Sequence, residues 1–324
     1  MKVAILYIIA ICTLTSCQES NKKTRDQNES FKSIKNSYTE EPSLVILGIA
    51  QDGGYPHPGC AKACCSRIFD QNQKAQKVVS IGLIDPENDI SIMLEATPDF
   101  TYQNQLLQSH TKHNNSKMPD AIFITHAHIG HYTGLMYLGR EALGAQGLPV
   151  YAMPRMVDFL FHNGPWDQLV NLKNITLHTI QDSVNIGVYT IKPLHVPHRD
   201  EYSETVGYIV RGPSKSMLFI PDIDKWEKWS HDIAQWIQKV DYAFLDATFY
   251  SGAELPGRDM SLIPHPSVKE SLLLFKDLSN DDKSKIYWIH LNHTNPLLYK
   301  ESDEYLHVDT LPYQVAEEGI VLIM

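Results

Sequence analysis

Runs of basic residues, internal repeats and interior linkers are all missing from this sequence of 324 residues. Acidic residues outnumber basic residues by 38 to 28, and the formal net charge is −10. Binding to nucleic acid phosphates requires clustered Lys and Arg side chains, so this composition argues against nucleic acid as the main partner. The lack of a linker, together with a hydrophobic content of 43%, indicates one folded domain with a sizeable core.

Long hydrophobic runs are also scarce, and the first residues carry the clearest of them. The segment MKVAILYIIAICTLTSC, residues 1–17, has a lysine, a short apolar run and then small residues. The run is too short for a stable membrane span, so we interpret it as a signal peptide. Its last four residues, Leu14 to Cys17, resemble the lipobox of bacterial lipoproteins, which implies that Cys17 is lipidated. An ordinary secreted protein is the alternative interpretation.

Apolar residues are nearly absent from the next segment, residues 18–43. A polar stretch of this kind cannot bury a core, so it predicts a flexible tether. We therefore expect an extracytoplasmic lipoprotein on the periplasmic or cell-surface side of a bacterial membrane, which is its partner through the lipid anchor. The folded domain is expected over residues 44–324, and the sequence does not indicate its oligomeric state.

Cysteine is rare, with five residues in all. Cys12 leaves with the signal peptide, and Cys60, Cys64 and Cys65 lie together in the segment HPGCAKACC. An odd number of cysteines cannot be fully paired in disulfides. Two interpretations stay open: a disulfide from Cys60 to one of the other two, or a structural zinc ion held by three thiolates and a histidine.

Short apolar runs bounded by turn residues predict a succession of strands. We expect strands over residues 44–50, 77–85, 90–96, 120–125, 148–153, 175–180, 188–196, 205–212, 216–221, 241–247 and 285–291. Helical periodicity predicts helices over residues 134–145, 155–163, 226–240 and 266–278. Strands in two groups with helices between them favour an α/β fold of two mixed sheets, packed face to face and flanked by helices, over a doubly wound parallel sheet.

The segment FITHAHIGHYTG, residues 123–134, places three histidines directly after a predicted strand. His126 and His128 alternate along an extended chain, so both side chains point the same way, and His131 comes where the chain turns. Packing does not explain three imidazoles at this spacing. We therefore predict that His126, His128 and His131 bind metal.

This cluster resembles the His-x-His-x-Asp-His signature of the metallo-β-lactamase-fold metalloenzymes, with Gly130 in the place of the aspartate. The resemblance spans roughly residues 44–324 and implies an αββα sandwich with metal at the sheet edges. The family's later motifs follow in order, and each falls at the end of a predicted strand. By this resemblance the remaining metal ligands are His198 in VPHRDE, Asp222 in IPDID and His290 in WIHLNH.

The segments PHRDEYSETVG, PDIDKW and HLNHTNP narrow the resemblance to the pyrroloquinoline quinone (PQQ) biosynthesis B proteins. Related phosphodiesterases of phosphonate breakdown combine early cysteines with a histidine three residues after the last active-site histidine. That likeness implies a structural zinc site of Cys60, Cys64, Cys65 and His293. The spacing departs from the family pattern, because this chain has Cys-x-x-x-Cys-Cys in place of Cys-x-Cys-x-x-Cys.

Gly130 has no ligand to offer to the second metal of a dizinc hydrolase. The first position would keep His126, His128, His198 and Asp222, and the second would keep His131, His290 and a share of Asp222. Two histidines and a carboxylate also suit Fe²⁺ oxygenases. One or two active-site Zn²⁺ ions, or Fe²⁺ in their place, therefore stay open, and waters or a neighbouring carboxylate could complete a second zinc position.

Other residues have supporting roles in this interpretation. The resemblance favours His198 over His195 as a ligand, and His265 is a candidate substrate contact. Asp246 ends a strand and is expected to orient a ligating histidine, a role also assigned to Glu95 and Asp99. We expect catalysis to involve Asp222, His131 and Asp246.

The leading hypothesis is a metallo-hydrolase acting on a small-molecule or peptide-derived substrate, with iron-dependent oxidation also open. Metal would polarise the scissile group and activate water for hydrolysis. The PQQ resemblance implies processing of a tyrosine-derived precursor, although an exported protein points to a different, extracytoplasmic substrate. The alternatives are a phosphodiesterase-like hydrolase and a lipid-anchored metal-binding or ligand-binding protein without catalysis.

Overall fold

The computed structural model describes residues 38–70, 73–112 and 118–324. The predicted signal peptide, Cys17 and most of the predicted tether lie outside these residues. Within them, no helix combines the length and apolar character that crossing a membrane requires.

Fourteen strands in the described residues form two sheets of seven. The first sheet has the order β14-β1-β2-β3-β4-β5-β6, from β1 (Ser43–Gly48), β2 (Ser80–Asp85), β3 (Ile90–Leu94), β4 (Ala121–Phe123), β5 (Leu148–Ala152), β6 (Ile175–Thr179) and β14 (Val321–Ile323). The second has the order β13-β12-β11-β10-β9-β8-β7, from β7 (Val184–Ile186), β8 (Tyr189–His195), β9 (Val206–Arg211), β10 (Ser216–Ile220), β11 (Tyr242–Asp246), β12 (Ile286–Ile289) and β13 (Gln314–Val315).

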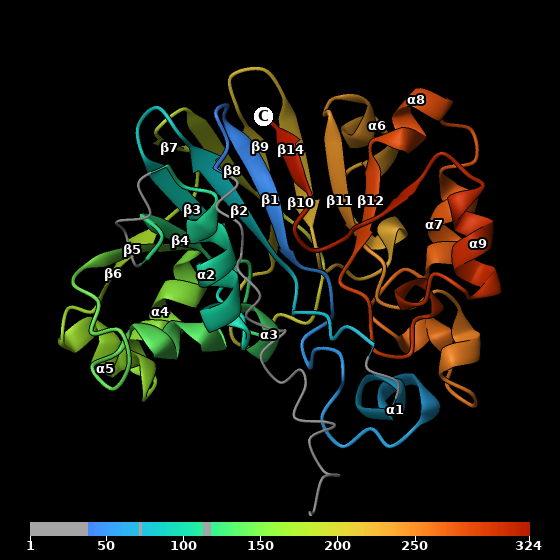
Figure 1. Cartoon of the computed structure of the whole chain (residues 1–324), viewed down its shortest axis with the longest axis horizontal. Helices are drawn as coiled ribbons and strands as arrows, with labels where there is room; N and C mark the ends of the chain where they lie inside the picture. The colour runs from blue at the N-terminus through green and yellow to red at the C-terminus, as the bar shows by residue number, and fades with distance from the viewer. Residues whose placement is uncertain (1–37, 71–72, 113–117) are drawn as a thin grey trace, which may run out of the picture. The chain divides into compact units, whose positions relative to one another are not determined.

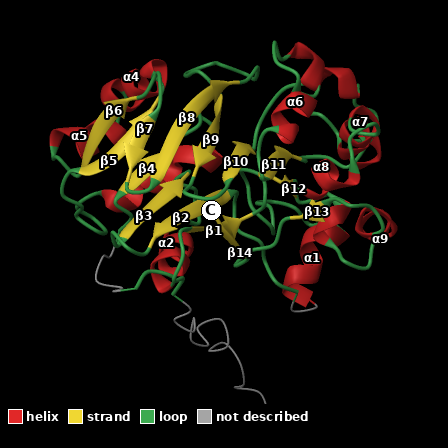
Figure 2. Ribbon diagram, turned by 90° about the horizontal axis from the view of Figure 1, so that it is seen from above, coloured by secondary structure: helices red, strands yellow, loops and turns green. Residues whose placement is uncertain are grey.

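Helices cover the outer faces of the two sheets (Figures 1 and 2). On the side of the first sheet lie α2 (Phe100–Ser109), α3 (Ile129–Tyr132), α4 (Pro154–His162) and α5 (Trp166–Asn171). On the side of the second lie α6 (Ile233–Gln238), α7 (Val268–Leu274), α8 (Asn280–Ser284) and α9 (Asp303–Asp309). The helix α1 (Ala63–Asp70) follows the loop after β1. This arrangement confirms the predicted sandwich of two mixed sheets flanked by helices.

The side chains of β1 are all buried and alternate between two cores, which shows how the layers are held together. Leu44 and Ile46 belong to the large core between the sheets, whereas Val45 and Leu47 belong to the core beneath the helices of the first sheet. Successive side chains of a strand point to opposite faces, so a strand that is apolar on both faces needs a layer on each side.

The carboxyl ends of several strands meet at one edge of the sandwich. Strands β10, β11 and β12 are parallel, and β8 runs with them because β8 and β10 are each antiparallel to β9. In the first sheet β4 is parallel to β3, and β1 runs the same way because β1 and β3 are each antiparallel to β2. Loops at the carboxyl ends of strands are the usual place for ligands in open α/β sheets.

A pair of backbone hydrogen bonds joins the two sheets at this edge. Leu291 N donates to Ile49 O over 2.8 Å, and Gln51 N donates to Leu291 O over 2.9 Å. The residue pair Ala50 and Leu291 thus forms a parallel bridge between the chain after β1 and the chain after β12. Side chains from these two segments are thereby held next to each other.

Two of the predicted helices were wrong in extent. Over residues 134–145 the structure has a 3-10 helix, Thr133–Leu138, which ends because Gly139 adopts an extended conformation. Over residues 226–240 it has a short 3-10 helix, Trp226–Lys228, and then α6. The interruption has a physical cause, since the Asp232 side chain accepts a hydrogen bond from Ala234 N and starts a new helix.

Candidate metal centre

The predicted ligands come together at the shared edge of the sheets. Each follows the carboxyl end of a strand: the three histidines of residues 126–131 follow β4, His198 follows β8, Asp222 follows β10 and His290 follows β12. The parallel course of these strands is what brings residues from four separate segments to one place.

Asp222 lies at the centre of this group, and only 2% of its surface is exposed. Its carboxylate oxygens lie 3.2 to 3.9 Å from nitrogens of six imidazoles, those of His126, His128, His131, His198, His265 and His290. Burial alone would raise the pKa of Asp222, but the surrounding histidines hold it well below its ordinary value. The group is therefore a carboxylate, the form that binds metal.

One set of possible ligands comprises His126, His128, His198 and Asp222, whose ligand atoms all lie within 4.8 Å of one another. His126 Nε2 lies 2.9 Å from His128 Nδ1 and 3.3 Å from Asp222 Oδ2. Burial lowers the pKa of His126 well below its ordinary value and that of His198 to about 4. Both rings are therefore neutral at physiological pH, as metal coordination requires.

His131 is fixed by two carboxylates on opposite sides of its ring. Its Nδ1 lies 3.2 Å from Glu95 Oε1, and its Nε2 lies 3.3 Å from Asp52 Oδ1. Burial alone would lower the pKa of His131, but Glu95 and Asp52 raise it well above the ordinary value. Glu95 adopts a positive φ of 76°, a conformation that costs roughly 1–2 kcal/mol for a residue with a side chain. Such strain is typical of functional sites.

His290 also adopts a positive φ, 63°, and its ring is oriented by a network of buried hydrogen bonds. Thr248 Oγ1 lies 2.8 Å from His290 Nδ1 and donates to Asp246 Oδ1 over 2.7 Å. Asp246 Oδ2 in turn lies 2.8 Å from Nδ1 of His265. Asp246 therefore contacts His265 directly and reaches His290 through Thr248, which leaves His290 Nε2 facing Asp222 at 3.9 Å.

Asp52, in the loop after β1, is a member of this site that the sequence did not reveal. Together with His131 and His290 it forms a third set whose ligand atoms lie within 4.8 Å of one another. Burial alone would raise the pKa of Asp52, but the nearby His131 ring holds it below the ordinary value. The only available signal was an acidic residue in a glycine-rich loop after the first strand.

Polar atoms without hydrogen-bond partners show that the residues of this site suit a metal ion. Several buried polar atoms among the described residues have no hydrogen-bond partner: both ring nitrogens of His198, Nε2 of His131 and of His290, Asp222 Oδ1 and Asp52 Oδ1. Leaving such an atom unpaired in a protein interior costs about 1–3 kcal/mol. So many on one small set of facing side chains indicate a site built to coordinate a cation.

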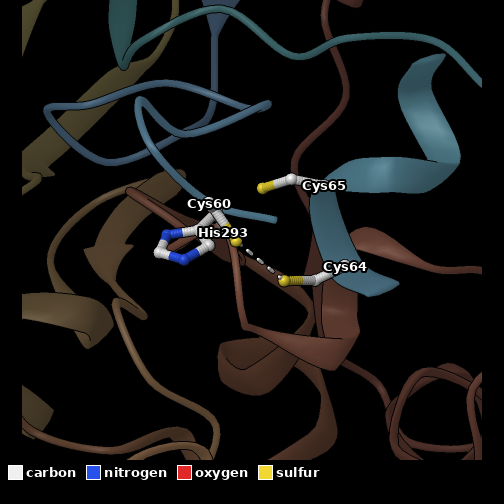
Figure 3. Close-up of side chains that lie close together, drawn as sticks. All are labelled: Cys60, Cys64, Cys65 and His293. Carbon is white, nitrogen blue, oxygen red and sulfur yellow. Dashed lines mark hydrogen bonds between the residues drawn. The ribbon is translucent and has the colours of Figure 1, made fainter. Parts of the chain in front are cut away.

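A separate group consists of Cys60, Cys64, Cys65 and His293 (Figure 3). Their possible ligand atoms all lie within 4.8 Å of one another. Cys60 Sγ lies 3.6 Å from Cys64 Sγ, and no disulfide joins any cysteine of the described residues. His57 N donates to Cys65 Sγ over 3.3 Å. His293 Nδ1 lies 3.0 Å from Asn292 Oδ1, which leaves Nε2 for a metal. The geometry thus resembles a metal site more than a disulfide.

Comparison with known proteins shows the family to which this chain belongs. The family model described as "Beta-lactamase superfamily domain" matches residues 90–291. The chain belongs to the beta-lactamase superfamily.

Relatives of this beta-lactamase superfamily member include proteins named for coenzyme synthesis. The chain is 26% identical over 306 residues to the coenzyme PQQ synthesis protein B of Methylorubrum populi, an alignment that covers 86% of this chain and 99% of the relative. It is also 26% identical over 311 residues to the protein of the same name from Acinetobacter baylyi, again with 86% and 99% covered. The resemblance to this group of proteins, expected from the motifs, is confirmed.

Solved structures share the fold. The 1.98 Å crystal structure of Zn²⁺-bound PqqB from Methylobacterium extorquens superposes with a TM-score of 0.72 at 20% identity, and covers 87% of this chain and 100% of that one. A diphosphatase from the PhnP family superposes with a TM-score of 0.62 at 21% identity, and covers 87% and 96%.

The structure brings together the predicted ligands of both metal sites. Cys17, the predicted lipidation site, lies outside the described residues. His265, expected as a substrate contact, lies inside the site 3.2 Å from Asp222 Oδ1. His195 is exposed, and Asp99 accepts a hydrogen bond from Val78 N over 2.9 Å, so neither takes part.

Proposed function

We propose that this beta-lactamase superfamily member is a metal-dependent hydrolase of a small-molecule or peptide-derived substrate. The observation that carries the proposal is the buried Asp222 carboxylate, which faces unpartnered nitrogens of His131, His198 and His290. Bound metal would polarise the scissile group and activate water for attack. Asp222, with histidines on both sides, would hold the metal.

The other polar residues of the site keep these ligands in position. Glu95 fixes the ring of His131 from the side opposite Asp52. Asp246 orients His265 directly and His290 through Thr248. Partners of this kind select the tautomer of a ligating histidine and raise its basicity.

Zinc is the metal that we assign to the site. All its ligand atoms are imidazole nitrogens and carboxylate oxygens, which zinc accepts, and the structural relative PqqB of Methylobacterium extorquens is Zn²⁺-bound. Several sets of possible ligands surround the single carboxylate of Asp222. An Fe²⁺ oxygenase needs only two histidines and one carboxylate on one face of the metal, so this larger supply of ligands favours hydrolysis over Fe²⁺-dependent oxidation.

A phosphodiester is a second candidate substrate. The group of Cys60, Cys64, Cys65 and His293 supports this alternative, because the resembled phosphodiesterases combine early cysteines with a histidine at this position. We assign that group a structural zinc ion.

We also propose that the enzyme acts outside the cytoplasm as a lipoprotein, anchored to a bacterial membrane through Cys17. Residues 1–17 support this proposal, and the polar segment that follows would let the domain reach soluble substrates. The net charge of −10 argues against nucleic acid as the substrate.

The test is metal analysis and hydrolysis by the full chain, purified without oxygen or added metal, beside the variant His126→Ala. The substrates are chromogenic esters, amides and bis(p-nitrophenyl) phosphate. We expect zinc that depends on His126 and hydrolysis that disappears with it. Iron lost in the variant, with oxygen consumed by the wild type, would replace hydrolysis by oxidation. Zinc binding without any hydrolysis would favour ligand capture, and the absence of any metal dependent on His126 would refute the proposal.

A further inference from the structure

Asp52 occupies, with its backbone as well as its side chain, the space next to residue 130 that a side chain there would need. A Cβ atom placed on Gly130 would lie 2.5 Å from the Cα of Asp52, and it would come closer still to Asp52 Oδ1. Real Cβ atoms do not approach other atoms so closely, so residue 130 has no room for a side chain while the loop holds Asp52 in this place. The glycine in the histidine cluster and the aspartate in the loop after β1 are therefore two parts of one feature.

The backbone holds Asp52 at this place firmly. Gln51 N and Leu291 N both take part in the bridge to the segment that carries His290. Gly54 N donates to Gln51 O over 2.7 Å and closes a turn around Asp52. The second carboxylate oxygen of Asp52 accepts a hydrogen bond from Gln51 Nε2 over 3.1 Å. Asp52 is thus oriented from both sides, and its other oxygen, Oδ1, points to the histidines.

The atoms that face one another here have the separations of ligands on one metal ion. Asp52 Oδ1 lies 3.3 Å from His131 Nε2, and both atoms are buried without a hydrogen-bond partner, as is His290 Nε2. Bonds of about 2.1 Å in a tetrahedral zinc site place neighbouring ligand atoms about 3.4 Å apart. Asp222 Oδ2 lies 3.7 Å from His131 Nε2 and 3.9 Å from His290 Nε2, within reach of the same ion.

We propose that Asp52 completes a second metal position together with His131, His290 and a shared Asp222. Asp52 would take the part that the aspartate of the histidine motif plays in dizinc relatives. The first position would use His126, His128, His198 and the other side of Asp222. This inference rests on the proposed function and makes the hydrolase a two-metal enzyme, in which two ions about 3.5–4 Å apart hold the substrate and the attacking water.

The test is the number of zinc ions bound per chain in three variants of the full chain: Asp52→Asn, Asp52→Gly and Gly130→Asp. We expect Asp52→Asn and Asp52→Gly each to lose one zinc ion, because the second position then loses the carboxylate that the loop after β1 supplies. Gly130→Asp should lower the melting temperature. Asp232→Asn, which removes an exposed carboxylate from the start of α6, should keep the zinc content of the wild type.

A crystal of the zinc-loaded wild type provides a second readout. Anomalous scattering at the zinc edge should give a peak between Asp52, His131 and His290, and this peak should be absent from Asp52→Asn. Unchanged zinc content in Asp52→Asn, or a peak from a single active-site ion in the wild type, would overturn the assignment of Asp52 while the hydrolase stands. Absence of any zinc dependent on His126 would instead overturn the proposed function itself.

Discussion

Replacing His293 by alanine should separate the metal interpretation of the cysteine group from every alternative. The three cysteines lie within six consecutive residues, whereas His293 lies beyond β12. Zinc bound to the thiolates alone would add little to the stability of the fold, because an unfolded chain can bind it equally well. His293 is the ligand that ties zinc binding to the folded state, since only folding brings it to the cysteines.

The distances in the structure support a tetrahedral ion at this place. Zinc–sulfur bonds of about 2.3 Å put the sulfurs of a tetrahedral site about 3.8 Å apart. The Cys60 and Cys64 sulfurs are 3.6 Å apart, whereas the sulfurs of a disulfide lie about 2.05 Å apart. Burial also raises the pKa of the Cys65 thiol to about 12, so without a cation this thiol stays protonated and unreactive.

The size of the effect follows from mass action. Free zinc at about 1,000 times its dissociation constant stabilises a folded protein by about 4 kcal/mol. At roughly 2–4 °C per kcal/mol for a chain of this size, zinc should raise the melting temperature by about 10 °C. In His293→Ala we expect this contribution to be lost and only the rise due to the active-site ions to remain, because the thiolates then bind folded and unfolded chain alike.

The assay is thermal unfolding of the full chain with zinc and with chelator, beside zinc analysis. His57→Ala is the matched control, since the His57 ring packs on that of His293 with centroids 4.2 Å apart but belongs to none of the metal groups. An equal zinc-dependent rise in the wild type and in His293→Ala would refute the reasoning. So would a resistant bond between Cys60 and Cys64 that only a reducing agent opens.

Three further predictions concern the active site. Asp222→Asn should lose zinc that the wild type retains, and hydrolysis with it, because two of the three ligand sets in the active site include this carboxylate; zinc analysis checks it, and unchanged zinc content would contradict it. Glu95→Gln should weaken zinc binding about 10–100-fold, the usual effect of removing a partner that orients a ligating histidine; a chelator competition measures it, and equal affinity would show that His131 needs no such support. Gly130→Ala should cost about 1–3 kcal/mol of stability through overpacking against the backbone of Asp52, measured by denaturant unfolding; full stability of this variant would mean that the loop yields freely.

Much of the fold and of the ligand set could be predicted from the sequence. Short apolar runs predicted most of the strands, because a strand buried on both faces is apolar at every position. The helices were harder, since a cap such as Asp232 or a glycine such as Gly139 ends a helix inside a periodic stretch. The histidines could be found because their spacing follows from the alternation of a single strand end.

Contacts between distant segments were beyond the reach of the sequence. Thr248 orients His290 through a hydrogen bond that only the folded chain forms, and nothing in its local sequence distinguishes it from an ordinary polar residue at a strand end. Glu95 was expected to support a ligating histidine, but the sequence did not show that this histidine is His131. His265 was expected to contact substrate, and the structure places it beside Asp222, on an irregular segment before α7.

Gly130 shows how a local motif can mislead about a site that is not local. Within the histidine cluster the glycine is a missing ligand, and the second metal position looks incomplete. In the folded chain the carboxylate arrives from the loop after β1, and the glycine is what makes room for it. The chemistry of a site depends on which atoms meet, and a carboxylate can come from any segment that the sheets bring to the same edge. A missing motif residue in a protein of this fold is therefore weak grounds for expecting one metal fewer, until the atoms around the vacant side-chain position are known.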